Sequence, residues 1–266
     1  MEFLKLVRRR SFANELVYMS LNVGLAVAVA LVVFYTESIW LAIGLVMLSK
    51  WRVLAVRPRY WWVNVQSNMV DFIVSVSVVI HLAAVNAAPI VEPQKLALLG
   101  LVTLVYILWL LYVKPKGSRA MIVVQGLAAV FLGTTALYSV GFALPVAVTV
   151  LGMWMIGFTA TRHILASYDN ERYVFFLSLA TALVYAEIGW IAYHWTVAYA
   201  LPIFPSLQVP QVAIIMTLLG FVAYKTYDSF YHNAKVRSTD IILPVLLAVS
   251  IIAVLVFLFN RVGTAI

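Results

Sequence analysis

Apolar runs about 20 residues long follow one another along almost the whole chain, and they constrain its fold more than any other feature. A helix needs about 20 apolar residues to cross the roughly 30 Å hydrocarbon core of a bilayer, where the backbone must satisfy its own hydrogen bonds. Such runs lie at residues 15–34, 39–56, 69–85, 96–113, 121–140, 144–165, 173–200, 212–231 and 241–259. The sequence therefore predicts an all-α bundle of nine transmembrane helices that forms a single domain over residues 1–266.

The composition excludes a water-soluble protein. Apolar residues make up 65% of the chain and charged residues 11%, against about 45 to 50% and about 25% in soluble domains. The chain has no cysteine, which removes disulfides, iron–sulfur clusters and thiolate zinc sites. No two histidines have the spacing of metal ligands, so we expect neither a metal nor another cofactor.

The positions of the cations predict the orientation of the bundle. Cytoplasmic loops of membrane proteins carry an excess of Lys and Arg. With the N-terminus inside and the C-terminus outside, all but two of the 18 Lys and Arg residues, Lys95 and Arg261, lie on the inner side. The net charge of +8 is then a topology signal with anionic inner-leaflet lipids as its counter-charge, and not a sign of nucleic-acid binding. We expect a multi-pass protein of the cytoplasmic (inner) membrane; eight spans with one re-entrant run is the alternative.

Motifs of the common catalytic sites are absent from the sequence. It contains no His-Glu-x-x-His, no Gly-x-Ser-x-Gly, no Walker loop and no Gly-x-Gly-x-x-Gly. Zinc proteolysis, acyl transfer and nucleotide hydrolysis therefore have no residues to perform them. We assign no catalytic residue and expect a protein that is not an enzyme.

Glu187 is the one carboxylate whose position in the sequence is far from either membrane face. Val174 to Glu187 is about 13 residues, or about 20 Å at about 1.5 Å per residue, which places Glu187 roughly two thirds of the way across. An ionised carboxylate is costly at this depth, so we expect the group to be protonated or paired.

Three further side chains are candidates to act with Glu187. Trp190 and His194 share its helical face, and His194 lies near the outer interface. His81, on the third predicted span, lies at nearly the same depth as Glu187. A carboxyl group facing an imidazole is a candidate proton or ion relay that opens outward through His194. The alternative is a neutral hydrogen bond that only fastens two helices together, worth about 1 kcal/mol.

A second candidate site is the segment from Lys50 to Asn64, which mixes cations with tryptophans. Aromatic rings and basic side chains favour the headgroup level of a membrane. The segment is either a patch that binds lipid headgroups or a partner protein at the inner face, or an interfacial anchor. The patch residues are Lys50, Arg52, Arg57, Arg59, Trp61 and Trp62. Asp71, at the inner start of the next span, has Arg57 and Arg59 available as ion-pair partners.

Three functions remain open. The preferred hypothesis is a small transporter or proton-coupled permease with Glu187 as its protonatable group. The second is a non-catalytic membrane subunit or scaffold that binds a partner protein or lipid headgroups at the inner face. The third is a lipid-modifying membrane enzyme, disfavoured because a headgroup reaction requires its carboxylate nearer the surface.

The transporter hypothesis makes a direct prediction for Glu187. Glu187→Gln keeps the shape of the side chain but removes its ability to exchange a proton. We expect it to abolish pH-dependent flux in proteoliposomes while the fold stays intact, as judged by circular dichroism. Unchanged flux in the variant would rule out this role of Glu187.

Overall fold

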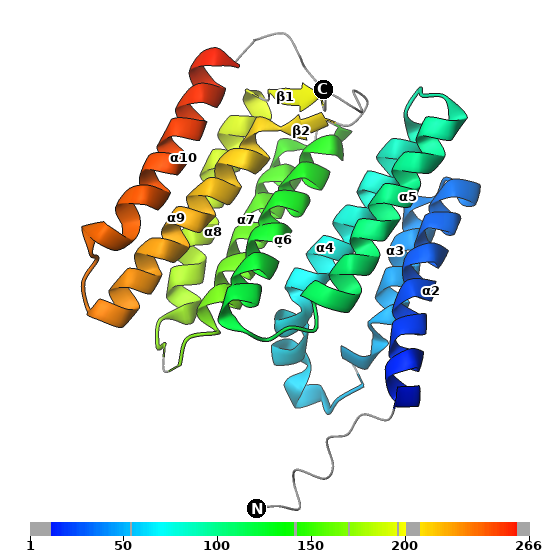
Figure 1. The fold of residues 1–266 in the computed structure, drawn as a ribbon, viewed down its shortest axis with the longest axis horizontal. Coiled ribbons are helices and arrows are strands. Elements are labelled where there is room, and N and C mark those ends of the chain that lie inside the picture. Colours follow the sequence, from blue (N-terminus) through cyan, green and yellow to red (C-terminus); the bar gives the residue numbers. More distant parts are fainter. Residues whose placement is uncertain are drawn as a thin grey trace, which may run out of the picture.

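The computed structural model describes residues 12–53, 55–140, 143–169, 171–195, 197–200 and 208–259. Over these ranges the chain forms nine α-helices that run alternately up and down side by side (Figure 1). They are α2 (Phe12–Thr36), α3 (Ile39–Ser49), α4 (Trp61–Ala87), α5 (Glu92–Leu108), α6 (Arg119–Val140), α7 (Val146–Leu165), α8 (Val174–His194), α9 (Gln211–Asn233) and α10 (Ser238–Leu258). The predicted all-α fold is confirmed.

Short elements complete the connections between these helices. The 3₁₀ helices η1 (Trp51–Val53) and η2 (Pro58–Tyr60) lie between α3 and α4, and the π-helix η3 (Trp109–Val113) continues α5. Strands β1 (Ala198–Ala200) and β2 (Gln208–Pro210) pair antiparallel between α8 and α9.

Prolines mark the starts of several helices. Pro93 lies in the first turn of α5, and Pro145 and Pro210 directly precede α7 and α9. Proline fits these positions because the first N–H groups of a helix have no partner within it. These prolines therefore indicate in the sequence where α5, α7 and α9 begin.

Seven helices of the described ranges are long and apolar enough to cross a membrane. α3 is apolar but has only 11 residues. α9 has 23 residues, and its second half carries Lys225 and Asp228. The helices are consistent with a multi-pass membrane protein, while the number of nine spans and their orientation remain predictions.

The second predicted span is shorter as a helix than its apolar run. The run extends to Val56, but α3 ends at Ser49. The chain then leaves the helical path because Arg57 precedes a proline and the Val53 carbonyl accepts a hydrogen bond from the Asn64 side chain (2.6 Å) instead of a helical N–H. Apolar composition alone did not reveal this irregular segment.

The helices form two groups with separate cores (Figure 1). Helices α2 to α5 enclose one core, which contains Val29, Val74 and Leu82. Helices α6 to α9 enclose the other, which contains Tyr138 and Met153, while α10 covers α9 at the edge. The two groups meet mainly where α4 packs against α6.

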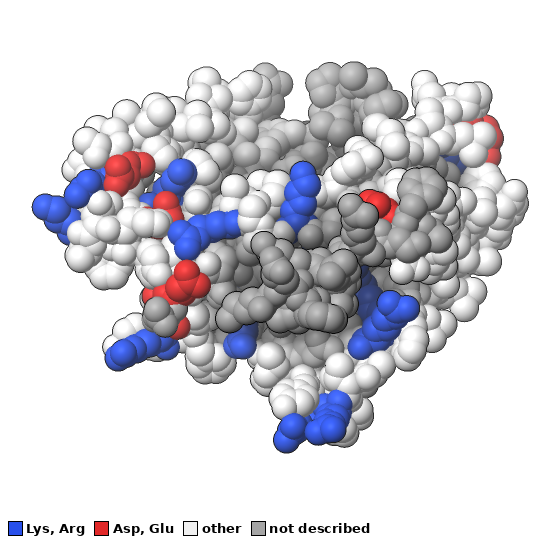
Figure 2. All heavy atoms as spheres, turned by 60° about the horizontal axis from the view of Figure 1, so that its bottom comes forward, with Lys and Arg blue, Asp and Glu red and all other residues white. Residues whose placement is uncertain are grey.

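One end of the bundle carries most of the described cations. Figure 2 shows Lys and Arg side chains spread over the face at the bottom of Figure 1. We call it the basic end; it is where α4, α6, α8 and α10 begin. Lys95 lies at the opposite end, in the first turn of α5, 3.7 Å from Glu92. Arg261 and the basic residues before Phe12 lie outside the described residues.

The closest helix packing in the bundle joins α7 to α8. A Cβ atom added to Gly157 of α7 would lie 2.6 Å from Cγ of Tyr185, and one added to Gly189 of α8 would lie 2.6 Å from Cγ of Met153. The Gly189 carbonyl also accepts a hydrogen bond from the Tyr138 hydroxyl of α6 (2.6 Å). Small residues allow such approach, and dispersion contacts then stabilise the helix pair in lipid.

We therefore expect Gly157→Ala and Gly189→Ala to destabilise the protein by about 1 to 3 kcal/mol each, because the added methyl group forces the helices apart. Gly100→Ala on α5 is the control, since a Cβ atom there meets nothing within 4 Å. Unfolding in mixed detergent micelles, followed by circular dichroism, measures the difference. Equal stability of all three variants would contradict the close packing of α7 and α8.

Candidate functional site

Glu187 lies on the exposed face of α8. Within the described part of the chain it makes no hydrogen bond and no ion pair, and α8 makes its main contacts with α7 on its other side. Its helical neighbours Trp190 and His194 are exposed as well, and their rings contact each other edge to face with centroids 4.8 Å apart. The carboxyl group thus faces the surroundings of the bundle and not its interior.

His81 lies elsewhere, on α4, which packs mainly against α6 and α5. Its Nδ1 is 2.5 Å from the Ser77 carbonyl oxygen, and since a carbonyl only accepts, Nδ1 carries a proton that it donates there. No hydrogen bond joins His81 to Glu187 among the residues that the structure describes. The sequence predicts nearly the same depth for both groups, but depth does not determine which way a side chain points around its helix.

A gap lies between α8, which carries Glu187, and α9. These helices follow each other in the chain but pack against different neighbours, α8 against α7 and α9 against α6 and α10. They touch each other only slightly. We call the gap the α8–α9 cleft.

Two cavities follow one another along the α8–α9 cleft. The cavity nearer the basic end has a volume of about 440 Å³ and is lined by Leu177, Thr181 and Val184 of α8, Met216, Leu219 and Tyr224 of α9, Leu127 of α6 and Ile164 of α7. The other has a volume of about 320 Å³ and is lined by Ile188, Ile191 and Trp195 of α8 and Gln211, Val212 and Ile215 of α9. Together they extend over nearly the full length of α8.

The lining of the cleft is apolar. Several of its polar side chains bond to other groups of the protein: Thr181 donates to the Leu177 carbonyl (2.9 Å), Tyr185 to the Met216 carbonyl (3.4 Å), and Gln211 to the Tyr199 hydroxyl (2.8 Å) and the Leu255 carbonyl (3.1 Å). The lining also includes Thr161 and the rings of Tyr224 and Tyr227. Such walls suit a hydrocarbon chain and give a hydrated ion no ligands.

Tyrosines and charged groups lie across the basic end of the cleft. Tyr168 donates a hydrogen bond to Asp228 (2.8 Å), and Tyr227, which also lines the larger cavity, donates to Glu171. The Arg119 guanidinium lies 4.5 Å from the centre of the Tyr168 ring. Burial, and then the Asp228 carboxylate, raise the pKa of the Tyr168 hydroxyl well above its usual range, so it remains a neutral donor.

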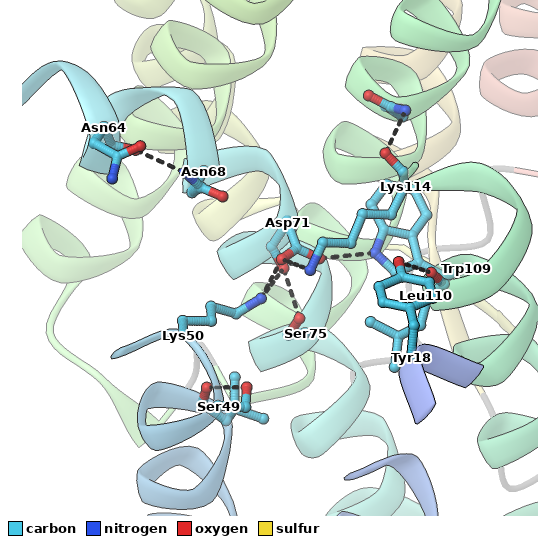
Figure 3. Close-up of polar contacts among 12 residues, drawn as sticks. Tyr18, Ser49, Lys50, Asn64, Asn68, Asp71, Ser75, Trp109, Leu110 and Lys114 are labelled. Atoms are coloured by element: carbon cyan, nitrogen blue, oxygen red, sulfur yellow. Dashed lines mark hydrogen bonds and ion pairs between the residues drawn. The ribbon is translucent and has the colours of Figure 1, made fainter. Parts of the chain in front are cut away.

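A second polar centre lies near the basic end of the other helix group (Figure 3). Asp71 of α4 forms ion pairs with Lys50, directly after α3, and with Lys114, directly after η3 (2.7 Å for Lys114). Its other carboxylate oxygen accepts a hydrogen bond from Nε1 of Trp109 (3.1 Å). The side chains of Lys50 and Asp71 are only 12% and 10% exposed. We call Lys50, Asp71 and Lys114 the charge cluster.

The charge cluster corrects one expectation. Arg57 and Arg59 were the predicted partners of Asp71, but both are exposed and the lysines take this position. Lys50 reaches Asp71 because α3 is short and ends beside α4, which the apolar pattern of the sequence did not indicate. The ion pair between Lys114 and Asp71 depends on how α5 packs against α4, and no pattern in the sequence indicates this packing.

The other residues of the basic and aromatic patch lie on the surface. Arg52, Trp61 and Trp62 are exposed, as are the two arginines that flank Pro58. Nε1 of Trp61 donates to the Val56 carbonyl (2.9 Å), which satisfies part of the irregular backbone after α3. Apart from Lys50, the patch thus lies on the outside of the bundle, on the connection from α3 to α4 and the start of α4.

Comparison of the chain with protein-family models, curated proteins and solved structures gives no match. In the part of the chain that the structure describes, no group of three or more His, Asp or Glu side chains could hold a metal ion. The cleft and the charge cluster are thus the features from which a function can be inferred.

The charge cluster predicts an asymmetry between two substitutions. Asp71→Asn leaves the buried Lys50 ammonium without its carboxylate and close to that of Lys114, whose side chain is 35% exposed, and breaking a buried pair in this way costs about 3 to 5 kcal/mol. Lys114→Met leaves the balanced pair of Lys50 and Asp71, so we expect a clearly smaller loss of stability. Unfolding of both variants in mixed micelles measures this difference, and equal losses would show that Lys114 and Lys50 do not share one carboxylate.

Proposed function

We propose that this protein binds an amphipathic membrane lipid in the α8–α9 cleft and moves it between the two halves of the bilayer. The observation that supports the proposal is the succession of two apolar cavities along one cleft. Their volumes, about 440 and 320 Å³, lie within the range of roughly 300 to 1,000 Å³ that ligand pockets have.

The route for the lipid chain follows one stripe of α8. Leu177, Thr181, Val184, Ile188, Ile191 and Trp195 line the two cavities in turn, and their spacing of three or four residues places them on one face of the helix. A chain seated against this stripe slides past side chains of similar character. The apolar surface that the lipid chain buries then changes little as the chain moves along the cleft, so this movement costs little free energy.

Glu187 lies beside the junction of the two cavities. It is three residues after Val184 and four before Ile191, which are its neighbours on the helix surface. Val184 lines one cavity and Ile191 the other. A lipid headgroup that crosses the bilayer loses its water, and the carboxyl group gives it a hydrogen-bonding partner at the middle of its route.

This proposal refines the transporter hypothesis. Glu187, Trp190 and His194 keep a role along the exposed rim of the cleft. His81 has no part in the route, because it lies in the other helix group and is bonded within its own helix.

Bulky side chains in the cleft test the proposal. Ala180 and Ala223 line the larger cavity from α8 and α9, and we expect Ala180→Phe and Ala223→Phe to obstruct the route. A barrier raised by about 1.4 kcal/mol slows a step about tenfold. The assay reconstitutes the protein in vesicles with a fluorescent phospholipid and follows its reduction by external dithionite.

Leu183→Phe is the matched control, because Leu183 is exposed on α8 but lines neither cavity. The proposal expects this variant to transfer lipid at the rate of the unaltered protein. Vesicles with the unaltered protein that are no faster than protein-free vesicles, or an equal loss in cleft and control variants, would refute it.

A further inference from the structure

The charge cluster carries one more positive than negative group. Two ammonium groups share the Asp71 carboxylate, and the side chains of Lys50 and Asp71 lie largely out of water at the basic end, while that of Lys114 is 35% exposed. An unbalanced charge in such a place is costly unless an anion accompanies it. No described acidic side chain other than Asp71 pairs with these lysines, so an anionic ligand beside Lys50 would balance the charge of the cluster.

Hydrogen-bond donors of the cluster are still available. The Lys50 ammonium has three N–H groups, and its bonds in the described chain go to the carboxylate and the carbonyl oxygen of Asp71. The Asn68 amide has two N–H groups and donates one to the Asn64 carbonyl (2.8 Å). Lys50 and Asn68 therefore each keep a donor, and both line the same cavity.

That cavity has a volume of about 350 Å³ and lies between the end of α3 and the first turns of α4. Apart from Lys50 and Asn68, its walls are the apolar side chains of Met47, Val53, Val65, Met69 and Phe72. The cavity thus combines two donors at its polar side with a hydrocarbon surface. A free inorganic anion would use only the donors and leave the apolar walls uncovered.

The surface around the cavity has the character of a headgroup region. Arg52, Arg57 and Arg59 are exposed on the connection between α3 and α4, and Trp61 and Trp62 are exposed at the start of α4. Basic side chains close to a membrane attract anionic lipids by about 1 kcal/mol each, and tryptophan favours the interface.

We propose that an anionic phospholipid binds at this place. Its phosphate accepts hydrogen bonds from Lys50 and Asn68 and supplies the negative charge that the cluster lacks, and one acyl chain fills the cavity between α3 and α4. The exposed arginines hold the rest of the headgroup. This site is separate from the α8–α9 cleft, and it does not depend on lipid transfer.

The test measures affinity by native mass spectrometry of the full chain in detergent, titrated with dioctanoyl phosphatidylglycerol or dioctanoyl phosphatidylcholine. We expect phosphatidylglycerol to bind about tenfold more tightly, which corresponds to about 1.4 kcal/mol. Asn68→Leu removes one donor, and Met69→Trp fills the cavity, while both keep the charge cluster intact. Each is expected to abolish most of the preference.

Lys235→Met is the matched control, since it removes an exposed cation of the basic end that lies far from the cavity in the chain; it should keep the preference. Equal binding of the two lipids, or an unchanged preference in both Asn68→Leu and Met69→Trp, would overturn the proposal. So would inorganic phosphate that displaces phosphatidylglycerol completely at millimolar concentration, because the site would then be one for the free anion.

Discussion

The close approach of α7 and α8 is the contact on which the shape of the second helix group depends. Gly157 and Gly189 let these two helices approach until the Tyr185 and Met153 side chains lie directly against the glycines of the facing helix, and the buried residues of α8 include Ser178 and Ala182. α8 has few contacts with α9, among them the hydrogen bond from the Tyr185 hydroxyl to the Met216 carbonyl (3.4 Å). Since α9 is held by α6 and α10, an apolar cleft opens between two helices that are consecutive in the chain.

The first helix group is organised by charge and not by small residues. Lys50 and Lys114 converge on Asp71, and this joins the ends of α3 and η3 to α4 at a level where the backbone after α3 is irregular. Irregular backbone near a membrane is tolerated only where protein groups satisfy it, as the Asn64 side chain does for the Val53 carbonyl. The two groups thus present different surfaces to lipid: an apolar cleft in one, and a cationic cavity at the basic end in the other.

The fold class could be predicted from the sequence because a run of about 20 apolar residues indicates both that a segment lies in a bilayer and that it forms a helix long enough to cross it. Each of the nine predicted runs corresponds to one helix. What the runs could not show is the direction in which a side chain points: Glu187 has the expected position along its helix but faces outward. The pairing of Asp71 with lysines and the cleft itself depend on which helices touch, and residues such as Gly157 reveal that only once the partner helix is known.

Lipid transfer by this protein requires above all that a lipid chain lies in the α8–α9 cleft. The most direct measurement is photolabelling of the reconstituted protein with a phospholipid that carries a diazirine in its acyl chain, followed by peptide mapping. The account predicts labels concentrated on the cleft-facing residues of α8 and α9, among them Val184, Ile188 and Leu219. Labelling spread evenly over the exposed faces of α2 and α10, with none in the cleft, would contradict it.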